Sequence, residues 1–156
     1  MDDKALNEII TKVINNVTSN TMTLDLARRI IYRVEEEAKK IGVKAVVAVS
    51  DSGANTIAVE CMDDAYIASF DFAVKKEYTS VALKMPTKKL KTLAQPGASL
   101  YGIQHTNNGK IVIFGGGVPL ILGDKVIGGV GVSGGSEEQD TYLGDFALSV
   151  FEEEIL

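Results

Sequence analysis

The sequence predicts an α+β domain in which helices pack on an antiparallel sheet of about five strands. Three observations lead to this prediction. Apolar residues recur at helical spacing in several segments, and β-branched apolar runs are joined by turn-forming residues. The predicted elements also follow the order helix, helix, hairpin, helices, hairpin, helix, which is typical of an α+β domain.

Two helices are predicted before the first strand. Residues 4–17 place apolar side chains at the i, i+3, i+4, i+7 spacing of one helical face. These side chains are Leu6, Ile9, Ile10, Val13, Ile14 and Val17. A polar run ends this helix and forms a linker, and the second helix starts after Thr23 as N-cap and stops at Gly42. We therefore expect residues 1–20 to be an amphipathic helical extension with its linker, and residues 21–156 to be the domain.

A hairpin and two further helices are predicted in the middle of the chain. Residues 43–50 are a β-branched apolar run typical of a buried strand, and residues 56–62 return as a second strand after turn-forming residues. Residues 69–83 have a helical pattern. The inward residues of that helix are expected to be Phe70, Ala73, Val74, Val81 and Ala82. Pro86 ends it, and Thr87 can cap a brief helix that follows.

The last third of the chain is predicted to form a second hairpin and a final helix. Residues 97–110 show no sustained periodicity of apolar residues. Strands are expected at 111–114, continuing through 118–122, and at 126–132. Residues 136–139 form a capping box, which opens the last helix.

Composition excludes several classes of protein. The chain has 156 residues, of which 46% are apolar and 24% charged, as in a globular domain. The net charge of −5, without a basic run longer than two residues, argues against a nucleic-acid partner or an anionic membrane. Cys61 is the only cysteine, so a disulfide within the chain and a cysteine-based metal cage are excluded. No segment approaches the about 18 apolar residues of a membrane span, and we expect a cytoplasmic protein.

Glycine is concentrated in one region, since nine of the 15 glycines lie between Gly115 and Gly135. Residues 129–134 spell GxGxxG, but only about one helix of chain follows, so the βαβ unit of a dinucleotide site cannot be completed. Glycine in a strand costs stability unless the backbone must approach something closely. Two interpretations remain open: the glycines line the wall of a pocket, or they allow close packing of strands or subunits.

Two isolated polar residues have a functional and a structural interpretation. Lys76 is either a solvated lysine of its helix or a cation directed at a glycine-lined pocket. His105 is the only histidine and lies in a polar stretch, where a solvated position is the simpler interpretation. It would need apolar surroundings to ligate haem, and a single histidine cannot build a metal site alone, so no metal site is predicted.

Several motifs together resemble the GlcG/HbpS/PduO C-terminal-domain family, whose members are described as haem-degrading or haem-binding. The resemblance covers about residues 22–155. It rests on Ala-Val-Ser-Asp-Ser-Gly at 48–53, Met-Asp-Asp-Ala at 62–65, Ala-Val-Lys-Lys at 73–76, Met-Pro-Thr at 85–87, Gly-Gly-Val-Pro-Leu at 116–120 and Gly-Gly-Val-Gly-Val-Ser-Gly-Gly at 128–135, with Asp140 just after. It implies a profilin-like sheet with helices and assembly into dimers or larger rings.

The resemblance also implies which residues surround a ligand. The ligand-binding positions carried over are Lys76, Gly116, Gly117, Pro119, Ser133, Gly134, Gly135 and Asp140. The family's Arg-Met-Asp-Gly is replaced here by Cys-Met-Asp-Asp at 61–64. The haem-ligating histidine that PduO-like members place near the domain's N-terminus has no counterpart in this chain.

The N-terminal segment is similar to the encapsulation peptides of bacterial microcompartment cargo. Such peptides are short amphipathic helices that dock their apolar face on shell or cargo proteins. The apolar face of residues 4–17 would then be the partner-binding surface. The alternative is a helix that packs on its own domain or at an oligomer interface.

The favoured functional hypothesis is a non-enzymatic, oligomeric accessory protein that binds haem or a corrinoid, with His105 as a candidate haem ligand. Such a protein could act within a microcompartment for diol or glycerol metabolism. One alternative is an enzyme acting on a small hydroxy acid, aldehyde or diol, with Lys76 and Asp140 as cation and acid/base candidates. The other is a scaffold subunit recruited to a shell by its N-terminal helix.

Overall fold

The computed structural model describes residues 2–18 and 21–155, apart from the side chains of residues 12, 13 and 15–18. The predicted contributions of Val13 and Val17 to an apolar helical face therefore lie outside the described residues. The elements follow the predicted order. They are α1 (Asp3–Thr18), α2 (Leu24–Lys40), β1 (Val46–Asp51), β2 (Thr56–Cys61), α3 (Ile67–Leu83), α4 (Thr87–Leu93), the 3-10 turns η1 (Ile103–His105) and η2 (Asn107–Gly109), β3 (Gly117–Leu122), β4 (Lys125–Ser133) and α5 (Glu137–Ile155).

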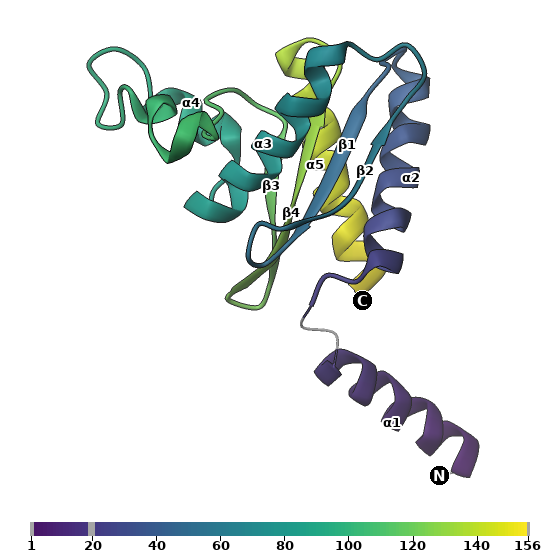
Figure 1. Ribbon diagram of the computed structural model, residues 1–156. Coiled ribbons are helices and arrows are strands. Elements are labelled where there is room, and N and C mark those ends of the chain that lie inside the picture. Colours follow the sequence, from purple (N-terminus) through teal and green to yellow (C-terminus); the bar gives the residue numbers. More distant parts are fainter. Residues whose placement is uncertain (1, 19–20, 156) are drawn as a thin grey trace.

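The fold is an α+β domain, as predicted, built on an antiparallel sheet in the order β2-β1-β4-β3. Helices α2 and α5 cover one face of the sheet and α3 covers the other (Figure 1). Helix α1 lies away from the sheet, beyond the N-terminal end of α2 (Figure 1). Among the described residues, no helix is both long enough and apolar enough to cross a membrane.

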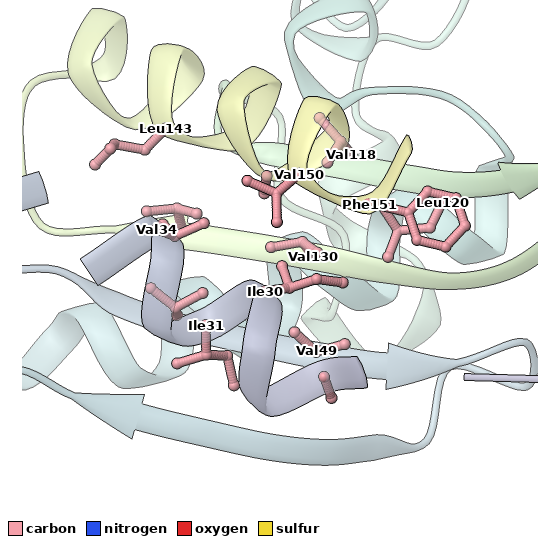
Figure 2. Close-up of a cluster of buried hydrophobic side chains, with 14 of the residues drawn as sticks. Ile30, Ile31, Val34, Val49, Val118, Leu120, Val130, Leu143, Val150 and Phe151 are labelled. Atoms are coloured by element: carbon pink, nitrogen blue, oxygen red, sulfur yellow. The ribbon is translucent and has the colours of Figure 1, made fainter. Parts of the chain in front are cut away.

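The main core lies between the sheet and the pair of helices α2 and α5. Ile30 and Val34 of α2 meet Val150 of α5 above the strands, as Figure 2 shows. The helices begin where local signals predict. The Thr23 hydroxyl accepts a hydrogen bond from the Leu26 amide at 3.1 Å, and this side-chain cap satisfies one of the free amides at the start of α2.

The predicted number of strands was too high, because the described residues form four strands rather than about five. Residues 111–114 do not join the sheet. Ile111 and Val112 are buried, but the Val112 amide donates to the Thr79 hydroxyl of α3 at 3.0 Å instead of to a neighbouring strand. Gly116 then adopts φ +118°, which turns the chain into β3. Apolar composition alone therefore misidentified this segment as a strand.

Helix α3 turns a largely polar face to the sheet: Ala73 and Val81 are buried as predicted, but other predicted inward residues are not. Phe70 is half exposed and Ala82 is exposed. The buried positions of α3 are Ser69, Ala73, Lys76, Glu77, Thr79, Ser80 and Val81. The physical reason lies in the opposite strands, because glycines there leave room for the helix backbone itself.

Gly117 of β3 and Gly129 and Gly131 of β4 lie directly under α3. A Cβ atom at Gly131 would sit 1.9 Å from the Ala73 carbonyl oxygen, and one at Gly117 would sit 2.5 Å from the Lys76 carbonyl oxygen. Both distances are far inside van der Waals contact, so only glycine permits this approach. For these residues close packing is the observed role, whereas Gly134 and Gly135 line a pocket.

Candidate functional site

A pocket of ≈ 300 Å³ lies where the N-terminal end of α3 meets the segment that joins β4 to α5. It is lined by Tyr66, Ala68, Ser69, Phe72, Phe114, Ser133, Gly134, Gly135, Glu137 and Asp140. Three of these residues are aromatic, and the rings of Phe72 and Phe114 meet edge to face at 5.6 Å between centroids. An apolar hollow with a few converging polar groups is the usual form of a small-molecule site.

A buried ion pair adjoins this pocket, which Asp140 lines and Lys76 does not. The Lys76 Nζ atom lies 3.0 Å from Asp140 Oδ2 and also donates to the Val132 carbonyl oxygen at 2.8 Å. The Lys76 side chain has no exposed surface, and that of Asp140 is 7% exposed. The Gly135 amide donates to the second carboxylate oxygen of Asp140 at 2.8 Å. Both charges are therefore paired and hydrogen-bonded, which a buried ion pair requires to be stable.

The protein environment acts on this pair in two opposing ways. Burial lowers the pKa of the Lys76 ammonium and raises the pKa of the Asp140 carboxyl. The attraction between the two groups opposes both shifts. The ammonium also lies 5.1 Å from the centroid of the Phe114 ring, a cation–π contact that further favours its charged form.

Local sequence explains how these groups come together. Lys76 lies on the buried face of α3, two turns after Ser69. The predicted capping box at the start of α5 is present, because the Gln139 amide donates to the Ser136 hydroxyl at 3.2 Å and the Ser136 amide donates to Gln139 Oε1 at 2.9 Å. This cap fixes the first turn of α5, and Asp140 then faces Lys76.

The structure brings together part of the predicted site. Ser133, Gly134, Gly135 and Asp140 line the pocket. Lys76 lies behind Asp140, and Gly116 lies beside it, since a Cβ there would be 2.9 Å from Lys76 Nζ.

The other predicted residues lie elsewhere. Gly117 is under α3, and Pro119 is a buried residue of β3 that pairs with Gly129. His105 is exposed in η1 and is not among the residues lining the pocket.

Residues that sequence reasoning missed form most of the pocket wall. Tyr66, Ala68, Ser69 and Phe72 come from the start of α3, Phe114 precedes β3, and Glu137 is the first residue of α5. The sequence carries one usable signal, the small residues Ser69 and Ala73 at helical spacing with Lys76, which mark a face in close contact with backbone. The aromatic walls carry no such signal, because Phe72 and Phe114 are distant in sequence.

A second buried polar cluster lies between α3 and the hairpin β1–β2. The Thr56 hydroxyl donates to Glu77 Oε1. Glu77 Oε2 and the Ser50 hydroxyl oxygen are buried and have no hydrogen-bond partner within the described part of the chain. Burial raises the pKa of Glu77 to about 8, with Asp51 adding to the rise and the bond from Thr56 opposing it.

Replacing Glu77 with glutamine should therefore stabilise the protein at alkaline pH. Between the ordinary value of 4.5 and about 8 the folded protein holds one more proton than the unfolded chain, so stability falls as pH rises through this window. The loss is about 1.4 kcal/mol per pH unit and at most ~5 kcal/mol over the whole window. We expect Glu77→Gln to match the wild type near pH 5 and to exceed it at pH 9 in urea unfolding.

The matched control for this prediction is Glu138→Gln, at an exposed position of α5. Its difference in stability from the wild type should stay within about 0.5 kcal/mol at both pH values. If Glu77→Gln likewise tracked the wild type from pH 5 to pH 9, Glu77 would be ionised throughout and the raised pKa would be wrong.

The chain is similar in sequence to known proteins. The family model described as "Haem degrading protein HbpS-like" matches residues 22–148. An uncharacterised 15.0 kDa protein from the dhaT-dhaS intergenic region of Citrobacter freundii is 49% identical over 133 residues, covering 85% of this chain and 94% of that protein.

Two solved structures share the fold over most of the chain. The crystal structure of Klebsiella pneumoniae protein ORFY has a TM-score of 0.82 at 44% identity, covering 84% of this chain and 90% of that one. The crystal structure of a PduOC–haem complex has a TM-score of 0.80 at 35% identity, covering 83% of this chain and 94% of that one.

Proposed function

The chain belongs to the HbpS-like family, and from this premise we propose that it is a non-enzymatic accessory protein that binds haem in the pocket above Lys76 and Asp140. The observation that carries the proposal is the pocket itself, with aromatic walls formed by Tyr66, Phe72 and Phe114 over a buried ion pair. The haem complex of the related PduOC supports the choice of ligand.

The residues of the pocket fit a haem edge in chemistry. Aromatic faces pack on the flat apolar surface of a porphyrin, and the lining also includes residues with hydroxyl and carboxylate oxygens. Bound haem would supply an iron that takes a further ligand from the protein. The protein would pack one face of the ring against the Phe72 and Phe114 side chains, which touch each other, and would shield one edge from water.

The charged pair favours binding over catalysis. Lys76 has no exposed surface, and its ammonium already contacts Asp140 and the Val132 carbonyl oxygen. A general acid or base must lie within hydrogen-bond reach of a substrate proton, which the fully buried Lys76 does not. We infer that the pair shapes and rigidifies the pocket. An enzyme acting on a small hydroxy acid, aldehyde or diol, and a protein that binds a corrinoid, remain the competing hypotheses.

We further propose that two or more copies share the ligand. A volume of ≈ 300 Å³ is at the small end of ligand pockets, which span about 300–1,000 Å³, so one chain covers only part of a haem. Exposed apolar side chains adjoin the pocket on α3, where Ile67 is 97% exposed and Phe70 is 51% exposed. A second copy seated on this surface would bury these side chains and enclose the rest of the ring.

An absorbance titration of the purified full-length protein with haemin tests this function. We expect a saturable shift of the Soret band, with an end point at one haem per chain or per defined oligomer. A second titration with cobalamin separates haem from a corrinoid. A linear, non-saturating response to haemin would contradict the proposal, and saturation with cobalamin alone would replace haem by a corrinoid.

For helix α1 we propose a separate role in recruitment to a microcompartment shell. Its side chains Leu6, Ile9 and Ile10 are 41%, 50% and 43% exposed, and they follow the spacing of one helical face. Such a face suits an apolar groove of a shell protein. A fluorescent reporter fused to residues 1–20 should gather at shells in cells that produce them. A matched fusion carrying Ile9→Asp and Ile10→Asp should stay diffuse, and an unmodified fusion that stayed diffuse would exclude the role.

A further inference from the structure

The pocket offers several oxygen donors, but most of them are already engaged. Glu137 accepts hydrogen bonds from Lys91 and from the Gly115 amide. Asp140 accepts from Lys76 and from the Gly135 amide. These carboxylates would have to give up buried or charged partners before they could bind iron.

The two serines are engaged as well. The Ser133 hydroxyl donates to the Ser69 hydroxyl at 3.2 Å, and both residues are buried, with 4% and 3% of their surface exposed. A neutral alcohol is also a weaker ligand for ferric iron than an anionic oxygen. The serines therefore fit the role of polar lining better than that of an iron ligand.

Tyr66 differs from all of these donors. Its hydroxyl has no hydrogen-bond partner among the residues that the structure describes, and its side chain lines the pocket while remaining 74% exposed. The backbone at this position is held in place, because the Ser69 amide donates to the Tyr66 carbonyl oxygen at 2.9 Å at the start of α3. Tyr66 therefore offers an unengaged phenol to the pocket from a backbone position that is held in place.

Histidine and sulfur ligands are not available at this pocket. The lining residues include no histidine, cysteine or methionine, and the chain's only histidine, His105, is exposed in η1. Phenolate oxygen is an established axial ligand of ferric haem, as in catalase. Tyr66 is thus the one lining side chain that combines a suitable donor atom with freedom to use it.

We propose that Tyr66 supplies the axial phenolate ligand to the ferric iron of haem bound in this pocket, an inference that rests on the proposed haem-binding function. The phenolate oxygen would take the place of a water ligand on the iron, the phenol proton would pass to solvent, and the iron would remain ferric throughout. The ligand is an anion, so it favours ferric over ferrous iron.

Resonance Raman spectra of the haemin complex test this assignment, since an iron–phenolate bond gives its own ring and Fe–O vibrations. We expect these bands in the wild type and their loss in Tyr66→Phe, with haemin affinity lowered at least about 10-fold, as losing even an outer-shell partner of a metal site costs 10–100-fold. Tyr66→Phe removes one exposed oxygen atom and should fold normally.

Two matched variants serve as controls. Tyr101→Phe makes the same change at another exposed tyrosine, and His105→Ala removes the only histidine. Both should keep the phenolate bands and the wild-type affinity. Phenolate bands that persisted in Tyr66→Phe, or a ligand signature lost only in His105→Ala, would overturn the assignment while leaving haem binding intact. A wild-type protein that failed to saturate with haemin would instead remove the proposed function.

Discussion

Gly131→Ala is expected to prevent folding or to lower the free energy of unfolding by at least ~4 kcal/mol, a loss that few single substitutions cause. The added Cβ would lie 1.9 Å from the Ala73 carbonyl oxygen and 2.7 Å from the Glu77 amide nitrogen. Both are backbone atoms of α3, so relief requires the whole helix to move off the sheet. That movement would also displace Lys76 from Asp140. Urea unfolding followed by circular dichroism gives the loss directly.

The matched control is Gly53→Ala in the turn between β1 and β2. The nearest atom to the added Cβ there is the amide nitrogen of the Asn55 side chain at 2.9 Å, which can rotate away. We expect a change of less than about 1 kcal/mol for this variant. Equal and small losses for Gly131→Ala and Gly53→Ala would show that α3 does not rest on the β4 backbone as described.

Lys76→Met should lower the free energy of unfolding by about 3–5 kcal/mol, the usual cost of removing one partner from a buried ion pair. Methionine keeps most of the side-chain volume, so the loss reports the charge rather than a cavity. The substitution leaves the Asp140 carboxylate buried without its cation, and the carboxylate becomes neutral by taking up a proton. The loss should therefore shrink as pH falls toward 4. Thermal unfolding at pH 4, 6 and 8 measures this dependence.

Two companion variants separate the ion pair from other effects. Lys75→Met, one residue earlier on α3, removes a partly exposed ion pair with Asp71 and should cost less than about 1 kcal/mol. The double variant Lys76→Met with Asp140→Leu should recover much of the loss, because no unpaired charge remains buried. If Lys76→Met were as stable as Lys75→Met at pH 8, the claim that Lys76 forms a buried ion pair with Asp140 would be wrong.

Local signals account for the parts of the fold that could be predicted. Thr23 and Gly42 bound α2, and Ser136 with Gln139 begins α5, because caps and left-handed glycines act on their own neighbours in sequence. The turn after β1 is likewise local, with Asp51 accepting the amides of residues 53 and 55. Such elements need no knowledge of their packing partner.

The predictions that were wrong all concern residues whose packing partner lies far away in the sequence. Phe70 and Ala82 of α3 were expected to be buried because helical periodicity assumes an apolar surface opposite the helix. The opposite surface is instead the glycine backbone at Gly129 and Gly131, which accepts small and polar side chains. The same holds for Ile111, which is buried by packing alone without joining the sheet.

The candidate site likewise has residues that could be predicted and residues that could not. The resemblance to a known family supplied Ser133, Gly134, Gly135 and Asp140, which do line one pocket. The aromatic walls and Tyr66 could not be predicted, because they converge from the start of α3 and from the segment before β3 only when α3 rests on the glycines. The position of α3 thus determines the pocket as well as the stability of the fold.

The most direct test of the central claim is a haemin titration of a protein whose pocket has been filled. Ala68 lines the pocket in the first turn of α3, and Ala82 is exposed at the other end of the same helix. The account predicts that Ala68→Trp loses the saturable Soret shift, whereas Ala82→Trp keeps it. Haemin binding of wild-type strength in Ala68→Trp would contradict the claim that this pocket is the ligand site.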